Sequence, residues 1–318
     1  MVLALRKLIG MKYLRQIEGV VPVVQTPLLK NAKFDAQGQA NLIEFLNSKQ
    51  VGGFWCLGTG SEDMNLSFER RLRVAKVVCR ANNGFTPLVL GCGFFCLDET
   101  FDFIEATQDL DFDAYHYMPY HPLLSMDRIA WIYKRIADFS KKPLFMYTSA
   151  NWAQPINSKF VSEMLGYKNI CGIKFSSSNT VEQLKVLNMQ TPDFQVITAV
   201  ANQFFAALAM GSKAGTTSMA GALPEPLIEM YEAFRDGGID DARNMQVNFQ
   251  KFSSMLPIGS KRDNFLTAAE EKFILNLRGV CEPYTTSYYR DLDDAEQKEV
   301  IRALEFAGYD KYLPEANR

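Results

Sequence analysis

Eight short apolar runs, each followed by a segment with helical periodicity, alternate along residues 19–236. Continuous apolar runs are typical of strands that are buried on both faces of a parallel sheet. Each repeat therefore predicts one β-strand followed by one α-helix. The predicted strands begin at Gly19, Gly52, Thr86, Ala114, Pro143, Asn169, Gln195 and Ala214.

Eight such units predict an α/β fold, a (β/α)8 TIM barrel with a C-terminal all-helical extension. A closed barrel is favoured over a doubly wound sheet because no Gly-rich dinucleotide fingerprint follows a predicted strand. The segment after residue 237 has no strand signal and predicts helices near 239–256, 264–277 and 294–307. The expected parts are a helical or loose N-terminal segment (1–18), the barrel (19–237) and the helical extension (238–318).

Composition and charge exclude several classes of protein. The formal net charge is −2, and acidic and basic residues are interspersed, so neither a nucleic-acid partner nor a disordered charged tail is expected. No apolar run approaches the ~20 residues that span a bilayer. We expect a cytoplasmic protein; mitochondrial import is the alternative, because the N-terminus is basic and has no acidic residue before Glu18.

The six cysteines contain no C-x-x-C pair, and the chain has two histidines, His116 and His121. This spacing does not suggest a zinc site. Buried free thiols in a reducing compartment are the simplest interpretation. No metal and no cofactor are expected.

Barrel enzymes carry their catalytic residues at the carboxyl ends of the strands. Lys174 follows an apolar run there, and a lysine in a low-dielectric site has a depressed pKa, so its neutral amine can attack a ketone. The alternative is a lysine that extends to solvent. Tyr147 is the natural proton-transfer partner, although a core tyrosine is the competing interpretation. The turn at residues 58–61 offers backbone N–H groups to a carboxylate, or is an ordinary loop.

Several segments, in order, resemble one known family. They are VVPVVQTPL, GTGSEDMNLSFERR, LFMYTSAN, NICGIKFSSSNTVEQL and GSKAGTTSMAGALPE. Over nearly its whole length the chain resembles the dihydrodipicolinate synthase / N-acetylneuraminate lyase family of class I pyruvate-dependent aldolases. The lysine segment is the most specific of these motifs, and it looks most like the lyase version.

The resemblance implies a role for individual residues. Lys174 matches the imine-forming lysine, Tyr147 the proton relay, and Thr59 the first hydroxyl of the loop that binds the keto-acid carboxylate. Glu62 matches a glutamate of that loop and is expected to be structural. The other substrate-binding candidates that the resemblance implies are Gly60, Ser61, Tyr120, His121, Thr148, Trp152, Thr217 and Ser218, with Tyr120 and His121 at a tyrosine pair of which one member can reach a neighbouring subunit.

The chain also departs from the family pattern. Gly60 replaces the second loop hydroxyl, which Ser61 or backbone N–H groups would have to supply, and Thr148 replaces an asparagine. Residues 151–154 contain no arginine to clamp a second carboxylate, which argues against dihydrodipicolinate synthesis. Residues 199–202 contain no acidic pair, which argues against N-acetylneuraminate. Trp152, with Phe175, would line a pocket for an aromatic or apolar aldehyde, or Trp152 packs under a helix.

These residues predict a Schiff-base lyase or aldolase that acts on pyruvate or a pyruvate-derived 2-keto acid and an aldehyde, with an altered second-substrate pocket. A dehydratase that uses the same imine is the close variant. The alternative from another class is a non-catalytic keto-acid-binding or regulatory barrel. The resemblance also implies a homotetramer or homodimer.

Overall fold

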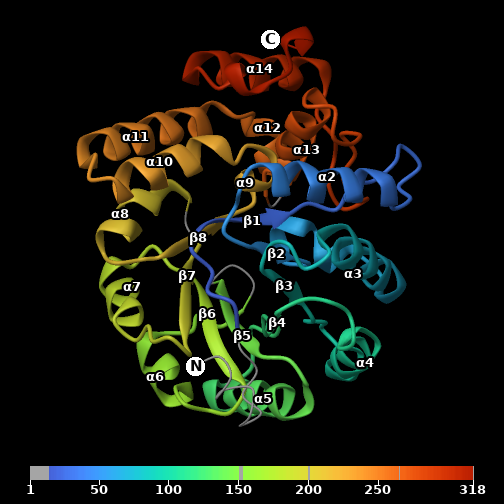
Figure 1. Cartoon of the computed structure of the whole chain (residues 1–318). Helices are drawn as coiled ribbons and strands as arrows, with labels where there is room; N and C mark the ends of the chain where they lie inside the picture. Colours follow the sequence, from blue (N-terminus) through green and yellow to red (C-terminus); the bar gives the residue numbers. More distant parts are fainter. Residues whose placement is uncertain (1–13, 150–152, 200, 265, 318) are drawn as a thin grey trace.

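The barrel is closed by eight parallel strands in sequence order, with the last strand paired to the first. The computed structural model describes residues 14–149, 153–199, 201–264 and 266–317. The predicted (β/α)8 fold with a C-terminal helical part is confirmed (Figure 1). The strands are β1 (Gly19–Val24), β2 (Phe54–Cys56), β3 (Leu88–Gly91), β4 (Ala114–Tyr117), β5 (Leu144–Ser149), β6 (Ile170–Ser176), β7 (Gln195–Thr198) and β8 (Ala214–Thr217).

Helices connect successive strands and form the outer ring in Figure 1. Side-chain caps fix several of their starts; the Ser67 and Ser125 hydroxyls, for example, each accept a hydrogen bond from a first-turn N–H group. The ring consists of α2 (Ala36–Ser48), α3 (Phe68–Asn82), α4 (Leu97–Thr107), α5 (Met126–Phe139), α6 (Ser158–Met164), α7 (Thr180–Leu187), α8 (Phe204–Ala209) and α10 (Glu225–Arg235).

The remaining helices lie at one side of the barrel. The short α9 (Met219–Ala222) follows β8, and α11 (Ile239–Met255), α12 (Ile258–Asp263), α13 (Ala268–Leu277) and α14 (Asp294–Ala307) make up the C-terminal part. Helix α11 packs on α10, α14 packs on α11, and α13 packs on α9. Helices α9 and α12 were not predicted, and the helix expected over 264–277 is α13, which begins at Ala268.

The core has two layers because strand residues alternate between the two sides of the barrel wall. On β2, Phe54 and Cys56 face the helices, whereas Trp55 faces the interior. Inside the barrel, the Trp55 ring stacks on His116 with 4.2 Å between centroids and meets Phe145 edge-on. The interior is therefore packed with rings below the carboxyl ends of the strands.

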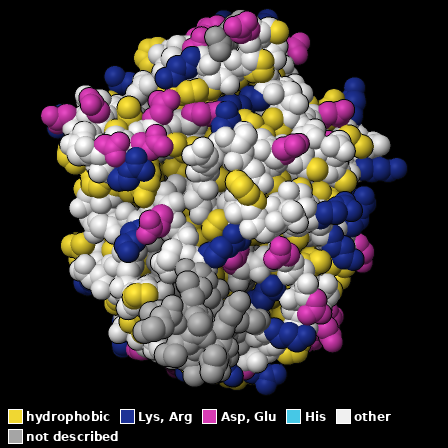
Figure 2. All heavy atoms as spheres, viewed as in Figure 1, with side chains coloured by type: hydrophobic (Ala, Val, Ile, Leu, Met, Phe, Trp, Pro, Cys, Tyr) yellow, Lys and Arg dark blue, Asp and Glu magenta, His cyan; other side chains and the backbone are white. Residues whose placement is uncertain are grey.

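The surface and the thiols agree in part with the sequence analysis. Lys, Arg, Asp and Glu side chains are interspersed on the face shown in Figure 2. Across the described residues, no helix combines the length and the apolar character that crossing a membrane requires. All six cysteines are free thiols; five are buried, and Cys96 is the exposed exception.

Candidate active site

Lys174 and Tyr147 lie side by side because their strands are in register. They are direct partners in the pairing of β6 with β5. Because side chains alternate along a strand, both point into the barrel near its carboxyl end. Lys174 is 4% exposed and Tyr147 is 3% exposed, so both polar groups are held away from bulk water.

A chain of hydrogen bonds joins the three residues predicted to be catalytic. The Lys174 Nζ donates to the Tyr147 hydroxyl at 3.2 Å. The Tyr147 hydroxyl is in turn 2.9 Å from the Thr59 Oγ1, which begins the short 3-10 helix η1 (Thr59–Ser61) after β2. The amine therefore has a continuous hydroxyl path along which protons can move.

Burial makes the amine a nucleophile near neutral pH. It lowers the pKa of Lys174 to about 7, and the nearby Asp63 carboxylate opposes this shift only in part. Burial also raises the pKa of Tyr147 far above that of a free phenol. Near pH 7 a large fraction of the amine is therefore neutral and able to attack, beside a protonated phenol that can donate.

Aromatic rings form the floor under the amine. The Lys174 Nζ lies 4.2 Å from the centre of the Tyr147 ring and 5.1 Å from that of Trp55. Burial, followed by the charge of Lys174, lowers the pKa of His116 well below its ordinary value, so this imidazole is neutral. The Tyr147 and Trp55 ring faces can stabilise a cation on the lysine nitrogen.

The loop after β2 is held from a distant part of the chain. Glu62 has left-handed backbone angles (φ 59°, ψ 28°), which cost a non-glycine residue about 1–3 kcal/mol. Its carboxylate accepts hydrogen bonds from the Thr286 N–H and hydroxyl, each at 2.7 Å, and forms a buried ion pair with Lys272. These contacts give Glu62 the structural role expected from the sequence and fix the position of Thr59.

Close packing accounts for Gly60. A Cβ atom at this position would lie 2.8 Å from the Ser218 Cβ and 3.1 Å from Val23. The loop therefore approaches the end of β8 as only a glycine permits. Ser61 does not supply a shifted hydroxyl, because its side chain is fully buried and accepts a hydrogen bond from the Gly58 N–H.

The cavity at the barrel mouth has a volume of about 160 Å³ and contains both Lys174 and Tyr147. Six of the predicted site residues line it together with six others. Its lining is Val23, Thr59, Gly60, Tyr147, Ser149, Lys174, Ser176, Ala199, Thr216, Thr217, Ser218 and Leu266. Apart from Lys174, the polar side chains of this lining are hydroxyls.

The structure does not bring the other predicted residues into this cavity. The Thr148 side chain points the opposite way from Tyr147 and accepts a hydrogen bond from the Ile156 N–H at 3.0 Å. Tyr120 donates to the Asp63 carboxylate at 2.7 Å and lines a separate cavity of about 220 Å³. His121 stacks on Phe95, with 4.3 Å between ring centroids.

The aromatic pocket inferred from the sequence is not supported by Phe175. This side chain is buried in the layer between the strands and the helices, on the opposite side of β6 from Lys174. Trp152 lies outside the described residues. Among the described residues that line the cavity, Tyr147 is the only aromatic one.

Sequence reasoning missed Ser149 and Ser176, which are direct partners across β5 and β6. Each lies two residues beyond a predicted catalytic residue, so each shares the inward face with it. That two-residue spacing was the available signal. The two serines lie one step nearer the mouth than Tyr147 and Lys174.

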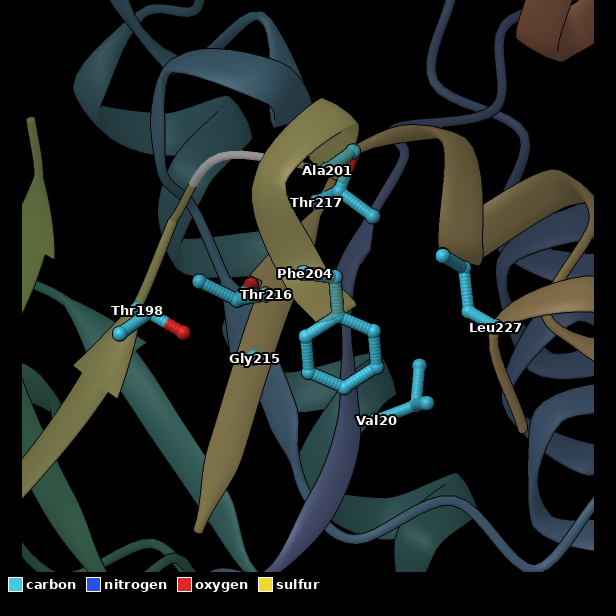
Figure 3. Close-up of a pocket in the computed structure, with 8 residues that line it drawn as sticks. All are labelled: Val20, Thr198, Ala201, Phe204, Gly215, Thr216, Thr217 and Leu227. Carbon is cyan, nitrogen blue, oxygen red and sulfur yellow. The ribbon is translucent and has the colours of Figure 1, made fainter. Parts of the chain in front are cut away.

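A second hollow is too small to be a substrate site. Figure 3 shows it beside the Phe204 ring, between β1, β7, β8 and helices α8 and α10. Its volume is about 10 Å³, which is room for roughly one water molecule. The cavity that contains Lys174 is the candidate active site because it lies at the carboxyl ends of the strands and contains the buried amine.

Known proteins share this architecture. The prophage protein YagE of Escherichia coli K12, solved with pyruvate, has a TM-score of 0.84 at 20% identity and covers 92% of this chain and 99% of its own. N-acetylneuraminate lyase of Proteus mirabilis has a TM-score of 0.85 at 19% identity, covering 93% and 100%. Likenesses at this identity establish the fold.

Similarity in sequence goes further. The 4-hydroxy-tetrahydrodipicolinate synthase of Methanosphaerula palustris is 27% identical over 267 residues, covering 83% of this chain and 90% of the relative. The model of the dihydrodipicolinate synthetase family matches residues 16–306, nearly the whole chain. The chain therefore belongs to the dihydrodipicolinate synthetase family, and it is an enzyme of the lyase and aldolase class.

Proposed function

We propose that this protein is a Schiff-base lyase or aldolase that forms an imine between Lys174 and pyruvate or a pyruvate-derived 2-keto acid. The observation that carries the proposal is the buried amine, with its lowered pKa, hydrogen-bonded to Tyr147 and through it to Thr59. A buried lysine without an ion-pair partner costs stability, and such a cost is typical of functional sites.

The first steps follow from the geometry. The carboxylate of the keto acid binds at the loop that begins with Thr59 and Gly60, which directs its carbonyl carbon to Lys174. The neutral amine attacks that carbon, so a C–N bond forms as the C=O π bond breaks. Tyr147 protonates the resulting alkoxide, and the carbinolamine loses water to give an iminium ion.

The iminium ion then acts as an electron sink. When the bond between C3 and C4 breaks, its electrons pass to the iminium and form an enamine. The C4 hydroxyl gives its proton back to the Tyr147 oxygen, and the C4 fragment leaves as an aldehyde. Protonation of the enamine and hydrolysis of the imine release pyruvate and restore Lys174. The same steps in reverse condense pyruvate with an aldehyde, and loss of a hydroxyl as water from the same intermediate is the dehydratase variant.

The cavity lining favours a small hydroxylated aldehyde as the second substrate. Ser149 and Ser176 lie on the mouth side of Lys174, where the part of the substrate beyond the keto acid would extend. Hydroxyl groups recognise other hydroxyls by donating and accepting hydrogen bonds. We also expect a homodimer or homotetramer, which stays a prediction.

Borohydride trapping tests the proposal. The enzyme is incubated with pyruvate and borohydride, and the modified peptide is identified by mass spectrometry. We expect an adduct on the Lys174 peptide of the wild type and none in Lys174→Ala. Lys142→Ala is the matched control, because Lys142 is also partly buried, with a lowered pKa, but contacts the Phe112 carbonyl away from the cavity.

The result decides between the two classes of function. An adduct in the wild type and in Lys142→Ala, but not in Lys174→Ala, supports the Schiff-base enzyme. If neither pyruvate nor another small 2-keto acid gives an adduct with the wild type, the proposed chemistry is wrong and the keto-acid-binding barrel replaces it.

A further inference from the structure

A buried carboxyl group lies directly behind the wall of the active-site cavity. Glu271, on α13, is fully buried. Its Oε2 accepts a hydrogen bond from the Gln25 amide at 2.9 Å, and its Oε1 accepts one from the Thr267 hydroxyl at 2.8 Å. The Ser218 side chain is a further polar neighbour, and its interaction with the carboxyl group lowers the pKa of Glu271. The adjacent Lys272 pairs with Glu62, so Glu271 is held by hydroxyl and amide groups.

Gln25 fixes the carboxyl group relative to the end of β8. Its amide nitrogen donates to Glu271 and, at 2.7 Å, to the backbone carbonyl of Ser218. Because both hydrogens of this amide are used, Gln25 holds Ser218 and Glu271 in one arrangement. Leu266, just before α13, lines the cavity itself, so this part of the chain closes the site from behind β8.

Ser218 also lies against the loop that is proposed to bind the keto-acid carboxylate. It lines the cavity, and its Cβ would be 2.8 Å from a Cβ added to Gly60. One serine hydroxyl thus lies between the Glu271 carboxyl group and the expected position of the substrate carboxylate. A hydroxyl has one proton to donate, so it cannot donate to two carboxylates at once.

We propose that Glu271 is a positioning residue that acts through Ser218 and takes up a proton when a 2-keto acid binds. With Glu271 ionised, Ser218 donates its proton to Glu271. With Glu271 protonated, the carboxyl donates to Ser218, which is then free to donate to the substrate carboxylate. The inference rests on the proposed function for the identity and place of that carboxylate.

The electrostatic surroundings of Glu271 support this exchange. Burial raises the pKa of Glu271 to about 7; the hydrogen bonds from Ser218, Gln25 and Thr267 oppose the shift, and the charge of Glu270 adds to it. Gln25 and Ser218, which face Glu271 from the residues just after β1 and β8, are uncharged, and Lys174 lies across the cavity. When Ser218 donates instead to a substrate carboxylate, Glu271 loses the interaction that opposes the shift, and its pKa rises further.

Isothermal titration calorimetry measures directly how many protons the protein takes up when pyruvate binds. Pyruvate is titrated into the wild type and into Glu271→Gln at pH 8, in two buffers with different heats of ionisation. We expect the wild type to take up nearly one proton per site more than the variant. Imine formation on Lys174 also binds protons, but it does so in both proteins and cancels in the difference.

The affinity for pyruvate must show the same coupling between substrate binding and proton uptake. The ratio of the wild-type dissociation constant for pyruvate to that of Glu271→Gln is expected to rise above pH 7, approaching tenfold per pH unit, and to be constant well below it. Glu270→Gln is the matched control, since it removes the neighbouring carboxylate and should keep the rise. A ratio that is constant within twofold from pH 6 to pH 9 would overturn the proposal.

Ser218→Ala tests the path through the hydroxyl. In this background, adding Glu271→Gln should change neither the proton uptake nor its pH dependence. If the difference of one proton persists, the coupling does not pass through Ser218 and the positioning role is wrong. Melting temperatures check that each variant is folded, and Ser218→Ala alone, the smaller change, should already remove the linked proton.

The two proposals fail in different ways. Absence of a borohydride adduct in the wild type removes the Schiff-base chemistry, whereas calorimetry reports pyruvate binding whether or not an imine forms. A wild type that is trapped by borohydride but takes up no additional proton relative to Glu271→Gln keeps its proposed function and loses only the role of Glu271.

Discussion

The same two strands supply two unlike steps of the cavity. Tyr147 and Lys174 form the inner step, and Ser149 and Ser176 form the outer step two residues nearer the mouth. Inner-step side chains are hydrogen-bonded to each other and onward to Thr59. At the outer step, the Ser176 hydroxyl donates instead to the Ala199 carbonyl at 3.3 Å.

This difference separates chemistry from recognition. The inner step is pre-organised, so a small displacement there disturbs a reacting atom. An outer-step residue contributes at most a hydrogen bond to a distant part of the substrate. A family can therefore change its second substrate at the outer step and keep its imine chemistry at the inner one.

Removal of the Tyr147 hydroxyl should have the largest effect. Because general acid–base catalysis contributes about 10²–10⁴-fold, Tyr147→Phe is expected to lower kcat by roughly that factor while the Lys174 adduct still forms slowly. Steady-state kinetics with a condensing aldehyde would measure it. Tyr115→Phe is the control, because its hydroxyl bonds Thr107 between the barrel and the helices. If kcat fell by less than threefold in Tyr147→Phe, the inner step would not carry the chemistry, and the contrast with the outer step would be wrong.

The pH dependence of imine formation sharpens the role of the inner step. In the proposed mechanism the neutral form of Lys174 is the nucleophile, and the pKa of this lysine is lowered to about 7. The single-turnover rate of adduct formation should therefore rise about tenfold per pH unit below 7 and level off above it. Measuring the rate in Glu271→Gln removes the second titrating group. A rate that still rises steeply between pH 8 and pH 10 would mean that the amine has an ordinary lysine pKa.

Ser176→Ala should have the smallest effect. The loss of one hydrogen bond of about 0.5–1.5 kcal/mol corresponds to a two- to tenfold higher KM for a hydroxylated aldehyde such as glyceraldehyde. Propanal, which lacks the hydroxyls, serves as the internal control and should be unaffected. Equal changes for both aldehydes, or a large fall in kcat, would assign Ser176 to the chemistry.

The barrel could be predicted from the sequence because its strands are continuous apolar runs. Such runs are buried whatever the exact packing of the residues around them. The inner step was also predicted, because Lys174 and Tyr147 end such runs and match the motifs of the family that the chain resembles. The outer step was missed because the runs become polar at Ser149 and Ser176, and only the pairing of β5 with β6 keeps these residues in strands.

Contacts between distant parts of the chain escaped prediction for a different reason. Glu271 and Gln25 are 246 residues apart, and no local pattern records that they meet. The close approach of Gly60 to Ser218 likewise depends on how a loop and a strand end pack together. The departure at Gly60 was visible in the sequence, but its steric cause was not.

Thr286 and Lys272, which hold the Glu62 carboxylate, lie late in the chain. Their position determines when the loop around Glu62 can be fixed during synthesis. Ribosomes synthesise the chain from its N-terminus, so all eight strands exist once Thr217 has been added. Thr286, which holds the Glu62 carboxylate, follows that carboxylate by 224 residues, and Lys272 also lies beyond the last strand. A nascent chain can thus complete its barrel wall before the loop that begins with Thr59 acquires its anchor, and this loop is held in place only after Thr286 has been added.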